Sequence, residues 1–274
     1  MSYLKIENKK FLIFGVANKR SVAYHIARTL EENGASAIHS VQNEKNAEAV
    51  LKLFPSAEIH ICDVENEGQI YDMASLLKEK HGEIQGIVHS LAYANYSDGL
   101  KPFYETKKKD FLQAIDISCF SLIAIANAMR DIINKDGSVI TISISATNMA
   151  VENYGYMAPI KAALDSSVCF LAKSFSKFSN IRFNAVAASL LKTSASAGIP
   201  GYLDYYDFAE KFTLRKKNLM TEEVGTLGAF LLSPASSGIN AQRVVIDAGM
   251  GVNFFDNEVI RLASLGSKHS DNEN

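Results

Sequence analysis

Cysteine is scarce in this chain, and its placement excludes two kinds of site. The 274 residues include three cysteines, Cys62, Cys119 and Cys169, which lie far apart and form no C-x-x-C pair. An odd number of distant cysteines makes neither a disulfide framework nor a zinc cluster. Each lies in an apolar run, so we expect buried free thiols in a reducing compartment. The six histidines show no ligand spacing either, and we expect no metal site.

The chain also lacks an excess of charge and a long apolar run. Its formal net charge is −2, which gives no reason to expect a nucleic-acid or anionic-membrane partner. No stretch approaches the roughly 18 consecutive apolar residues of a membrane span. The apolar run 11–17 follows lysines but is not followed by a small-residue cleavage site. We therefore expect a cytoplasmic protein.

Linkers rich in proline, glycine or serine are absent, which predicts a single domain over residues 1–265. Short apolar runs alternate with amphipathic segments predicted to be helices at 21–33, 46–54, 68–82, 109–134 and 154–178. The runs are continuously apolar, as in strands buried on both faces; they span 10–17, 36–41, 58–64, 84–94, 137–145, 181–189 and 242–249. This predicts an α/β fold with a Rossmann-type doubly wound parallel sheet of about seven strands and helices on both faces. Residues 193–220 interrupt the pattern as a helical excursion, and the polar tail 266–274 is predicted to be disordered.

The first strand–helix turn lacks the G-x-G-x-x-G fingerprint of dinucleotide-binding folds, since FGVANKRSVA retains only Gly15. Such a turn needs a flexible residue, small side chains near a pyrophosphate and a helix N-terminus aimed at the anion. Gly15 meets the first need, and Ala17 and Ala23 meet the second. Ser21 can cap the helix and donate its hydroxyl to a phosphate. The alternative is an ordinary strand–helix turn with a serine N-cap.

Two later strand ends also fit a dinucleotide. Asp63 follows EIHIC at the end of the predicted strand 58–64, where its carboxylate can accept a hydrogen bond from an adenine amino group. The strand at 84–94 ends in the small residues of HSLAYA, which leave room for a ligand across the strand ends. Asp63 taken alone is more often explained as a loop residue or a helix cap.

The segment ENYGYMAPIKAALDSS contains the candidate catalytic pair. On a helix, positions seven apart lie within about 20° of one another, which favours Tyr154 as the partner of Lys161; Tyr156 would lie about 140° away. A tyrosine can donate to a developing oxyanion, and a nearby ammonium lowers its pKa. Two amphipathic side chains on a helix surface are the alternative.

Together these segments resemble the enoyl-[acyl-carrier-protein] reductases of bacterial fatty-acid synthesis, which are divergent short-chain dehydrogenases. The resemblance covers residues 2–255 and is carried by GVANKRSVAYHIA, CDV at 62–64, VHSLAYA, Tyr-x6-Lys within YGYMAPIKAALDS, LKTSASAGI, EEVG with LLSPASSGI, and DAG at 247–249. It implies hydride transfer from NADH to the β-carbon of a trans-2-enoyl thioester during fatty-acid elongation. It also implies an acyl carrier protein as partner and a homotetramer.

The resemblance also implies roles for individual residues. Tyr154 stabilises the enolate and contacts substrate together with Ala94, while Lys161 holds the cofactor ribose. The other residues implied to bind the cofactor are Gly15, Ser21, Val22, Gln42, Asp63, Val64, Leu91, Leu191, Lys192, Thr193, Ser194 and Ala195.

Three positions depart from the family pattern. A second active-site tyrosine, common ten residues before the first, is Ile144 here, and Tyr156 and Ser145 are the candidates to replace it. Ser189-Leu190 replaces the usual Gly-Pro before the substrate loop. Asp204 occupies a helix that often carries basic residues, and its charge would repel an acidic carrier. Basic residues slightly further on either receive the carrier or form a solvated face; they are Lys211, Arg215, Lys216 and Lys217.

The cofactor choice and the substrate class each leave alternatives. NADH is favoured over NADPH because VQNEKN after the second strand has no arginine placed for a 2′-phosphate, and Glu44 would repel one. Lys19, Arg20 and Lys45 favour NADPH instead. The alternative functions are a paralogous short-chain reductase acting on another enone or carbonyl, such as a coenzyme A thioester, and a dinucleotide-binding sensor without catalysis.

Overall fold

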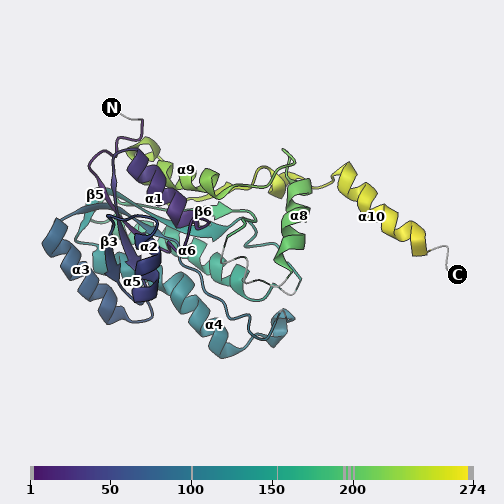
Figure 1. The fold of residues 1–274 in the computed structure, drawn as a ribbon, viewed down its shortest axis with the longest axis horizontal. Helices are drawn as coiled ribbons and strands as arrows, with labels where there is room; N and C mark the ends of the chain where they lie inside the picture. Colours follow the sequence, from purple (N-terminus) through teal and green to yellow (C-terminus); the bar gives the residue numbers. More distant parts are fainter. Residues whose placement is uncertain are drawn as a thin grey trace.

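A seven-stranded parallel sheet forms the centre of the molecule (Figure 1). The computed structural model describes residues 3–99, 101–152, 154–193, 196, 199 and 201–270. The strands are ordered β3-β2-β1-β4-β5-β6-β7, and all neighbouring pairs are parallel. Their bounds are β1 Lys10–Phe14, β2 Ser36–Val41, β3 Glu58–Ile61, β4 Ile84–His89, β5 Ile133–Ile144, β6 Arg182–Ala188 and β7 Arg243–Ile246. The predicted Rossmann-type α/β fold is confirmed.

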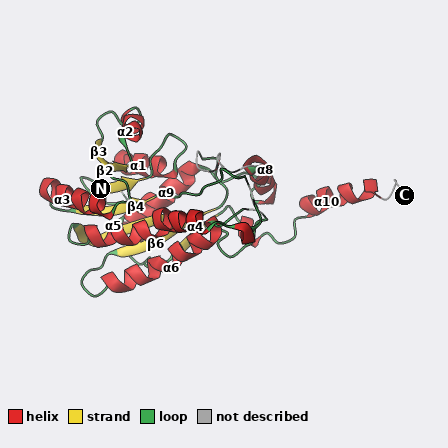
Figure 2. Ribbon diagram, turned by 90° about the horizontal axis from the view of Figure 1, so that it is seen from below, coloured by secondary structure: helices red, strands yellow, loops and turns green. Residues whose placement is uncertain are grey.

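Helices cover both faces of the sheet (Figures 1 and 2). One face packs against α1 (Val22–Glu32), α2 (Glu44–Leu51) and α9 (Thr221–Leu232), with Ile26, Val50 and Leu231 in its core. The other packs against α3 (Glu67–His81), α4 (Lys108–Ile115), α5 (Ser121–Met129) and α6 (Met157–Phe175), with Ile70, Leu122 and Leu164 in its core. Because both faces are covered, every residue of β4 and of β6 is buried, including the polar side chains of Gln85, His89, Arg182 and Asn184.

The long helix predicted over 109–134 is shorter and is interrupted. A π-helical turn, Asp116–Phe120, joins α4 to α5, and the helix ends at Met129 because β5 already begins at Ile133. Residues 108–129 are long and apolar enough to cross a membrane by length and composition alone, a test that core helices of soluble proteins also pass. Here α5 packs against α3 and α6.

The C-terminal part of the chain departs most from the predictions. Helix α8 (Tyr202–Phe212) lies within the predicted excursion, and α10 (Asn257–Ser270) extends away from the body of the molecule (Figures 1 and 2). Helix α10 continues through residues 266–270 of the tail for which disorder is predicted, and residues 271–274 lie outside the described part of the chain. Cys62 and Cys119 are buried free thiols as expected, but Cys169 is exposed because it lies on the face of α6 turned away from the core.

Candidate active site

A pocket of about 810 Å³ runs along the carboxyl ends of the strands. Each of β1 to β6 contributes residues at or just after its C-terminal end, including Gly15, Gln42, Asp63, Leu91 and Ile144. The sheet order places β1 between β2 and β4, and open α/β sheets bind ligands in the crevice at such a switch in strand order. A pocket of this size has the volume typical of cofactor sites.

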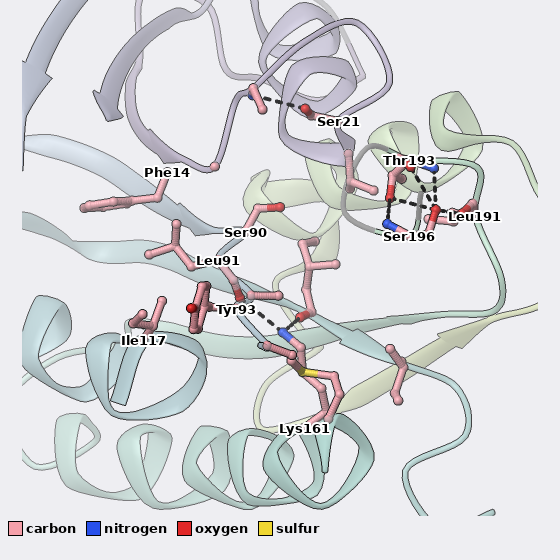
Figure 3. Close-up of a pocket in the computed structure, with 18 of the residues that line it drawn as sticks. Phe14, Ser21, Ser90, Leu91, Tyr93, Ile117, Lys161, Leu191, Thr193 and Ser196 are labelled. Atoms are coloured by element: carbon pink, nitrogen blue, oxygen red, sulfur yellow. Dashed lines mark hydrogen bonds between the residues drawn. The ribbon is translucent and has the colours of Figure 1, made fainter. Parts of the chain in front are cut away.

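The turn after β1 forms one wall of this pocket. Gly15 has φ +96°, and a Cβ added there would lie 2.0 Å from the carbonyl oxygen of Ser90. Only glycine therefore lets this turn approach the end of β4 so closely. The prediction that Ser21 caps α1 through its side chain is wrong. Its Oγ instead accepts hydrogen bonds from the N–H groups of Ala17 and Asn18, both at 3.1 Å, and so closes the turn (Figure 3).

The ends of β2 and β3 bring together the residues expected at the adenosine end. Gln42 Nε2 donates to Asp63 Oδ2 at 3.3 Å, and the N–H of Asp63 donates to Gln69 Oε1 at 2.8 Å. Both Gln42 and Asp63 line the pocket, as does Val64. The pair therefore presents a carboxylate and an amide at one end of the pocket, a combination that can accept from and donate to a heterocycle.

Lys161 lies in the middle of the pocket wall and is almost fully buried, with 4% of its surface exposed. Its Nζ donates to the carbonyl oxygens of Leu91 at 3.2 Å and Ile142 at 2.7 Å, at the ends of β4 and β5 (Figure 3). An ammonium has three N–H donors, so one remains for a ligand. Burial lowers the pKa of Lys161 to about 8, although the charge of Asp165 acts in the opposite direction.

Tyr154 lines the same pocket but does not lie on the helix that carries Lys161. Helix α6 begins at Met157 with Tyr156 as its N-cap, and Gly155 has φ +79°, which ends the helical geometry before Tyr154 is reached. The argument from helical angles is therefore wrong, although both residues contribute to one pocket. The expected lowering of the tyrosine pKa is also wrong, because burial raises the pKa of Tyr154.

Tyr156 and Ser145, the candidates to replace the second family tyrosine, do not reach this pocket. Tyr156 packs edge-on against Phe111, and its hydroxyl oxygen accepts from the N–H of Asn95 at 3.0 Å. Ser145 bonds through its N–H to the carbonyl of Ala188, and within the described part of the chain neither Ser145 nor Tyr156 belongs to the pocket lining. Ile144 itself forms part of the wall.

Three residues that sequence reasoning missed line the pocket instead. Tyr96 donates through its hydroxyl to the carbonyl of Tyr154 at 3.5 Å. The Tyr202 hydroxyl accepts from the N–H of Leu191 and donates to its carbonyl oxygen, both at 2.9 Å. Ser143 Oγ is buried with no hydrogen-bond partner among the described residues. Of these, only the tyrosine-rich segment YLDYY gives a signal in the sequence, because aromatic side chains cluster there beside the predicted substrate loop.

The loop after β6 closes the far side of the pocket. Ser196 Oγ donates to the carbonyl of Leu191 at 2.8 Å and accepts from the N–H of Thr193 at 2.9 Å, which fixes a compact turn (Figure 3). Leu191 and Thr193 line the pocket, as do Leu91, Ala94 and Val22. Lys192 does not; it is exposed, and its Nζ lies 5.9 Å from the centroid of the Tyr206 ring. The predicted residues Ser194 and Ala195 lie outside the described part of the chain.

Comparison with known proteins places this architecture in a family. A family model described as Enoyl-(Acyl carrier protein) reductase matches residues 15–251. The chain belongs to the enoyl-(acyl carrier protein) reductase family. A reductase of this family from Staphylococcus aureus, named as NADPH-dependent, is 33% identical over 251 residues, covering 90% of this chain and 98% of that protein. One from Nostoc sp., named as NADH-dependent, is 35% identical over 253 residues, covering 90% and 97%.

A solved enoyl-(acyl carrier protein) reductase has the same architecture. The crystal structure of the NADH enzyme from Aquifex aeolicus superposes with a TM-score of 0.87 at 32% sequence identity, covering 93% of this chain and all of that chain. The resemblance that the sequence motifs predicted is therefore confirmed for the family and the fold.

Proposed function

We propose that the protein reduces the trans-2 double bond of an enoyl thioester with hydride from a nicotinamide cofactor, as a step of fatty-acid elongation. The observation that carries the proposal is the arrangement of Tyr154 and Lys161 in one pocket that crosses the carboxyl ends of the strands. The pocket fits a dinucleotide because its walls hold a glycine turn too tight for a Cβ, a buried ammonium with one N–H left, and the Oγ of Ser143, which has no partner among the described residues. When bound, the nicotinamide supplies the hydride.

Lys161 and the first turn would hold the cofactor. The N-terminus of α1 would present backbone N–H groups to a pyrophosphate, and the helix dipole would favour its negative charge; the Ala17 and Asn18 N–H groups of the turn already donate to Ser21. Lys161 would donate its remaining N–H to a ribose hydroxyl. Gln42 and Asp63 would contact the adenosine end.

Tyr154 would act on the substrate. Reduction at the β-carbon leaves negative charge on the thioester oxygen, and a phenol positioned there stabilises the resulting enolate by donating a hydrogen bond. Because burial raises the pKa of Tyr154, the phenol keeps its proton at neutral pH and remains a donor.

The test compares two neighbouring tyrosines. We expect Tyr154→Phe to lower kcat with a crotonyl thioester by about 100-fold or more, measured by NADH absorbance, while the Kd for NADH changes by less than about threefold. The matched control is Tyr156→Phe, which removes a hydroxyl outside the pocket and should leave kcat within about threefold of wild type. Equal kinetics for wild type and Tyr154→Phe, or no turnover of any enoyl thioester, would contradict the proposal.

For the cofactor we favour NADH over NADPH. Relatives named for either cofactor are about equally similar, so the preference rests on the adenosine end itself. There, Asn43 caps α2 through its side chain, and Glu44 in the first turn adds a negative charge that disfavours a 2′-phosphate. The measurement is kcat/KM with each cofactor, and a higher value with NADPH would reverse the assignment.

The acyl carrier protein is the partner we favour, although two of the predicted basic contacts are already engaged. Arg215 pairs with Glu223 at 2.5 Å, and Lys216 pairs with Asp256. Lys211 and Lys217 form no ion pair among the described residues and remain to meet an acidic carrier. Comparing carrier-bound with coenzyme A thioesters tests this assignment, and equal kcat/KM values would favour the paralogous reductase.

We also infer a homotetramer in the cytoplasm. Exposed apolar side chains on the outer faces of the helices support the assembly; they include Leu112, Phe120, Ile123 and Phe170. Light scattering after gel filtration measures the mass, and a monomer would contradict the inference.

A further inference from the structure

Arg243 bonds to groups from two other elements at once. It begins β7, and its Nε donates to Asp165 Oδ2 of α6 at 2.9 Å. Its Nη2 donates to the carbonyl oxygens of Ile144 at 2.8 Å and Ser145 at 2.6 Å, at the end of β5. These bonds use the planar fork of the guanidinium, which a lysine ammonium cannot reproduce in full.

The side chain reaches β5 by crossing a whole strand. The sheet order places β6 between β5 and β7, and Arg243 pairs in register with Ala185 of β6. Ala185 belongs to the core beneath α6, and strand alternation places Ala187 on the same face. Two alanines therefore leave the space that the arginine side chain occupies between β6 and α6.

The carbonyls that Arg243 holds lie where the chain leaves the sheet. The N–H of Ser145 makes the last backbone bond to β6, and residues 145–156 then contain turns but no helix or strand among those described. This segment carries Tyr154, and it begins beside Ile144 in the pocket wall. We propose that Arg243 and Asp165 form a clamp that positions the end of β5, and through it the pocket wall at Ile144 and the segment that carries Tyr154.

Asp165 links the clamp to Lys161, the lysine of the Tyr154–Lys161 pair. It lies four residues after Lys161 on α6, so the two side chains share a face of the helix. Its Oδ1 is buried without a hydrogen-bond partner among the described residues. The charged or titratable groups that act on Lys161 are Asp165, Cys119 from the π-helical turn and His89 from β4. Arg243 partly neutralises the carboxylate among them.

The kinetic part of the test for Arg243 rests on the proposed function. The test therefore also measures amide hydrogen exchange, which does not depend on that function. We expect Arg243→Met to speed amide hydrogen exchange in residues 145–152 by about tenfold or more, because the carbonyl anchors are lost. We expect kcat for the enoyl thioester to fall about tenfold while the Kd for NADH stays within about threefold. Arg243→Lys should recover part of both, because it retains one donor group.

The pH dependence distinguishes the clamp from a merely structural contact. Without Arg243 the Asp165 charge acts on Lys161 uncompensated, so the pH above which NADH binding weakens should rise. Asp165→Asn removes that charge, and the same pH limit should fall. The two variants are expected to shift the pH limit of NADH binding in opposite directions only if Arg243 and Asp165 act on Lys161.

Arg182→Met is the matched control. Arg182 of β6 is also a buried arginine that donates to backbone carbonyls, those of Leu231 and Ser233, but these lie in and just after α9, away from the pocket. The variant should lower Tm without changing exchange in residues 145–152 or kcat per folded molecule.

Wild-type hydrogen exchange and kcat in Arg243→Met would overturn the clamp. If that variant does not fold, wild-type exchange in Asp165→Asn would do so. Absence of enoyl reduction in the wild type would refute the proposed function and leave the exchange test intact.

Discussion

Gly15 shows how a single missing atom shapes the site. An added Cβ would meet the Ser90 carbonyl oxygen at 2.0 Å, and φ +96° is strained for any other residue. We expect Gly15→Ala to lower the free energy of unfolding by about 2 kcal/mol or more and to weaken NADH binding, because the turn must separate from β4. Chemical denaturation and a binding titration measure these effects.

Gly238 provides the control for that prediction. A Cβ at this position meets no atom within 4 Å. Gly238→Ala should therefore leave both the unfolding free energy and NADH affinity close to wild type. Equal behaviour of the two alanine variants would contradict the role assigned to Gly15.

Lys161 predicts a pH limit for cofactor binding. Its pKa is about 8 in the folded protein, against an ordinary value of 10.5, so the ammonium deprotonates as pH rises through about 8. We expect the Kd for NADH to increase above this pH, by up to about tenfold per pH unit, because the neutral amine is a weaker donor. Lys161→Arg stays protonated, so any binding it retains should lack this limit. A wild-type Kd that is flat to about pH 9.5 would contradict the assignment.

The lowered pKa of Lys161 weakens cofactor binding at high pH but has the opposite effect on folding stability. Between pH 8 and 10.5 the unfolded chain binds a proton at this lysine that the folded chain has released. The contribution of Lys161 to the free energy of unfolding therefore becomes more favourable as pH rises through that window. Loss of cofactor binding above pH 8 would thus not reflect unfolding caused by Lys161.

At the scale of elements, Glu58 ties the start of β3 to the end of α3. Burial raises its pKa, but hydrogen bonds with His60, His81 and Lys80 outweigh burial and lower it to about 2. The stabilisation is present above the ordinary pKa of 4.5 and is lost as pH falls from 4.5 towards 2. We expect Glu58→Gln to lower Tm at pH 7 and to converge with wild type at about pH 2, as measured by circular dichroism.

Glu48→Gln serves as the comparison, since Glu48 is an exposed glutamate on α2. Its Tm should stay near wild type throughout the same pH range. A constant Tm difference between Glu58→Gln and wild type at every pH would show that the carboxylate charge is not what stabilises this junction.

The start of α6 shows what periodicity can and cannot predict about an element. Apolar spacing located the helix that carries Lys161, but the pattern extends through Tyr154 although the helix does not. The positive φ of Gly155 determines the boundary, and the sequence does not show whether a glycine adopts it. Ser21 is similar: its position at the N-cap was predictable, but its bonding to the preceding turn was not.

At the scale of the molecule, α10 is separable from the fold. It lies beyond residue 251, where the family match ends, and it extends away from the sheet (Figure 1). Among the described elements it contacts α8. We expect removal of residues 257–274 to leave Tm within about 3 °C of wild type and NADH binding unchanged, because no core side chain is lost. Differential scanning calorimetry measures the first, and a large fall in Tm would show that α10 supports the core.

The sheet and the location of the pocket were the most predictable features of the whole molecule. Seven apolar runs gave the strands, and parallel order then required their carboxyl ends to share one edge, which brought Gln42, Asp63 and Leu91 to one pocket. Contacts that cross the sheet were not predictable. Arg243 reaches β5 over β6, and no local pattern encodes such a path.

Tyr154 lies on a turn and Lys161 lies on a helix. The distance between the phenol and the ammonium therefore depends on the length of the loop that carries Tyr154. A pair on one helix is confined to separations of three, four or seven residues. Here residues 145–156 can gain or lose residues, or change their turns, while the lysine and both of its carbonyl partners stay in place. Libraries that vary the length of this segment would therefore move the phenol of Tyr154 relative to Lys161 without changing the contacts that hold the lysine.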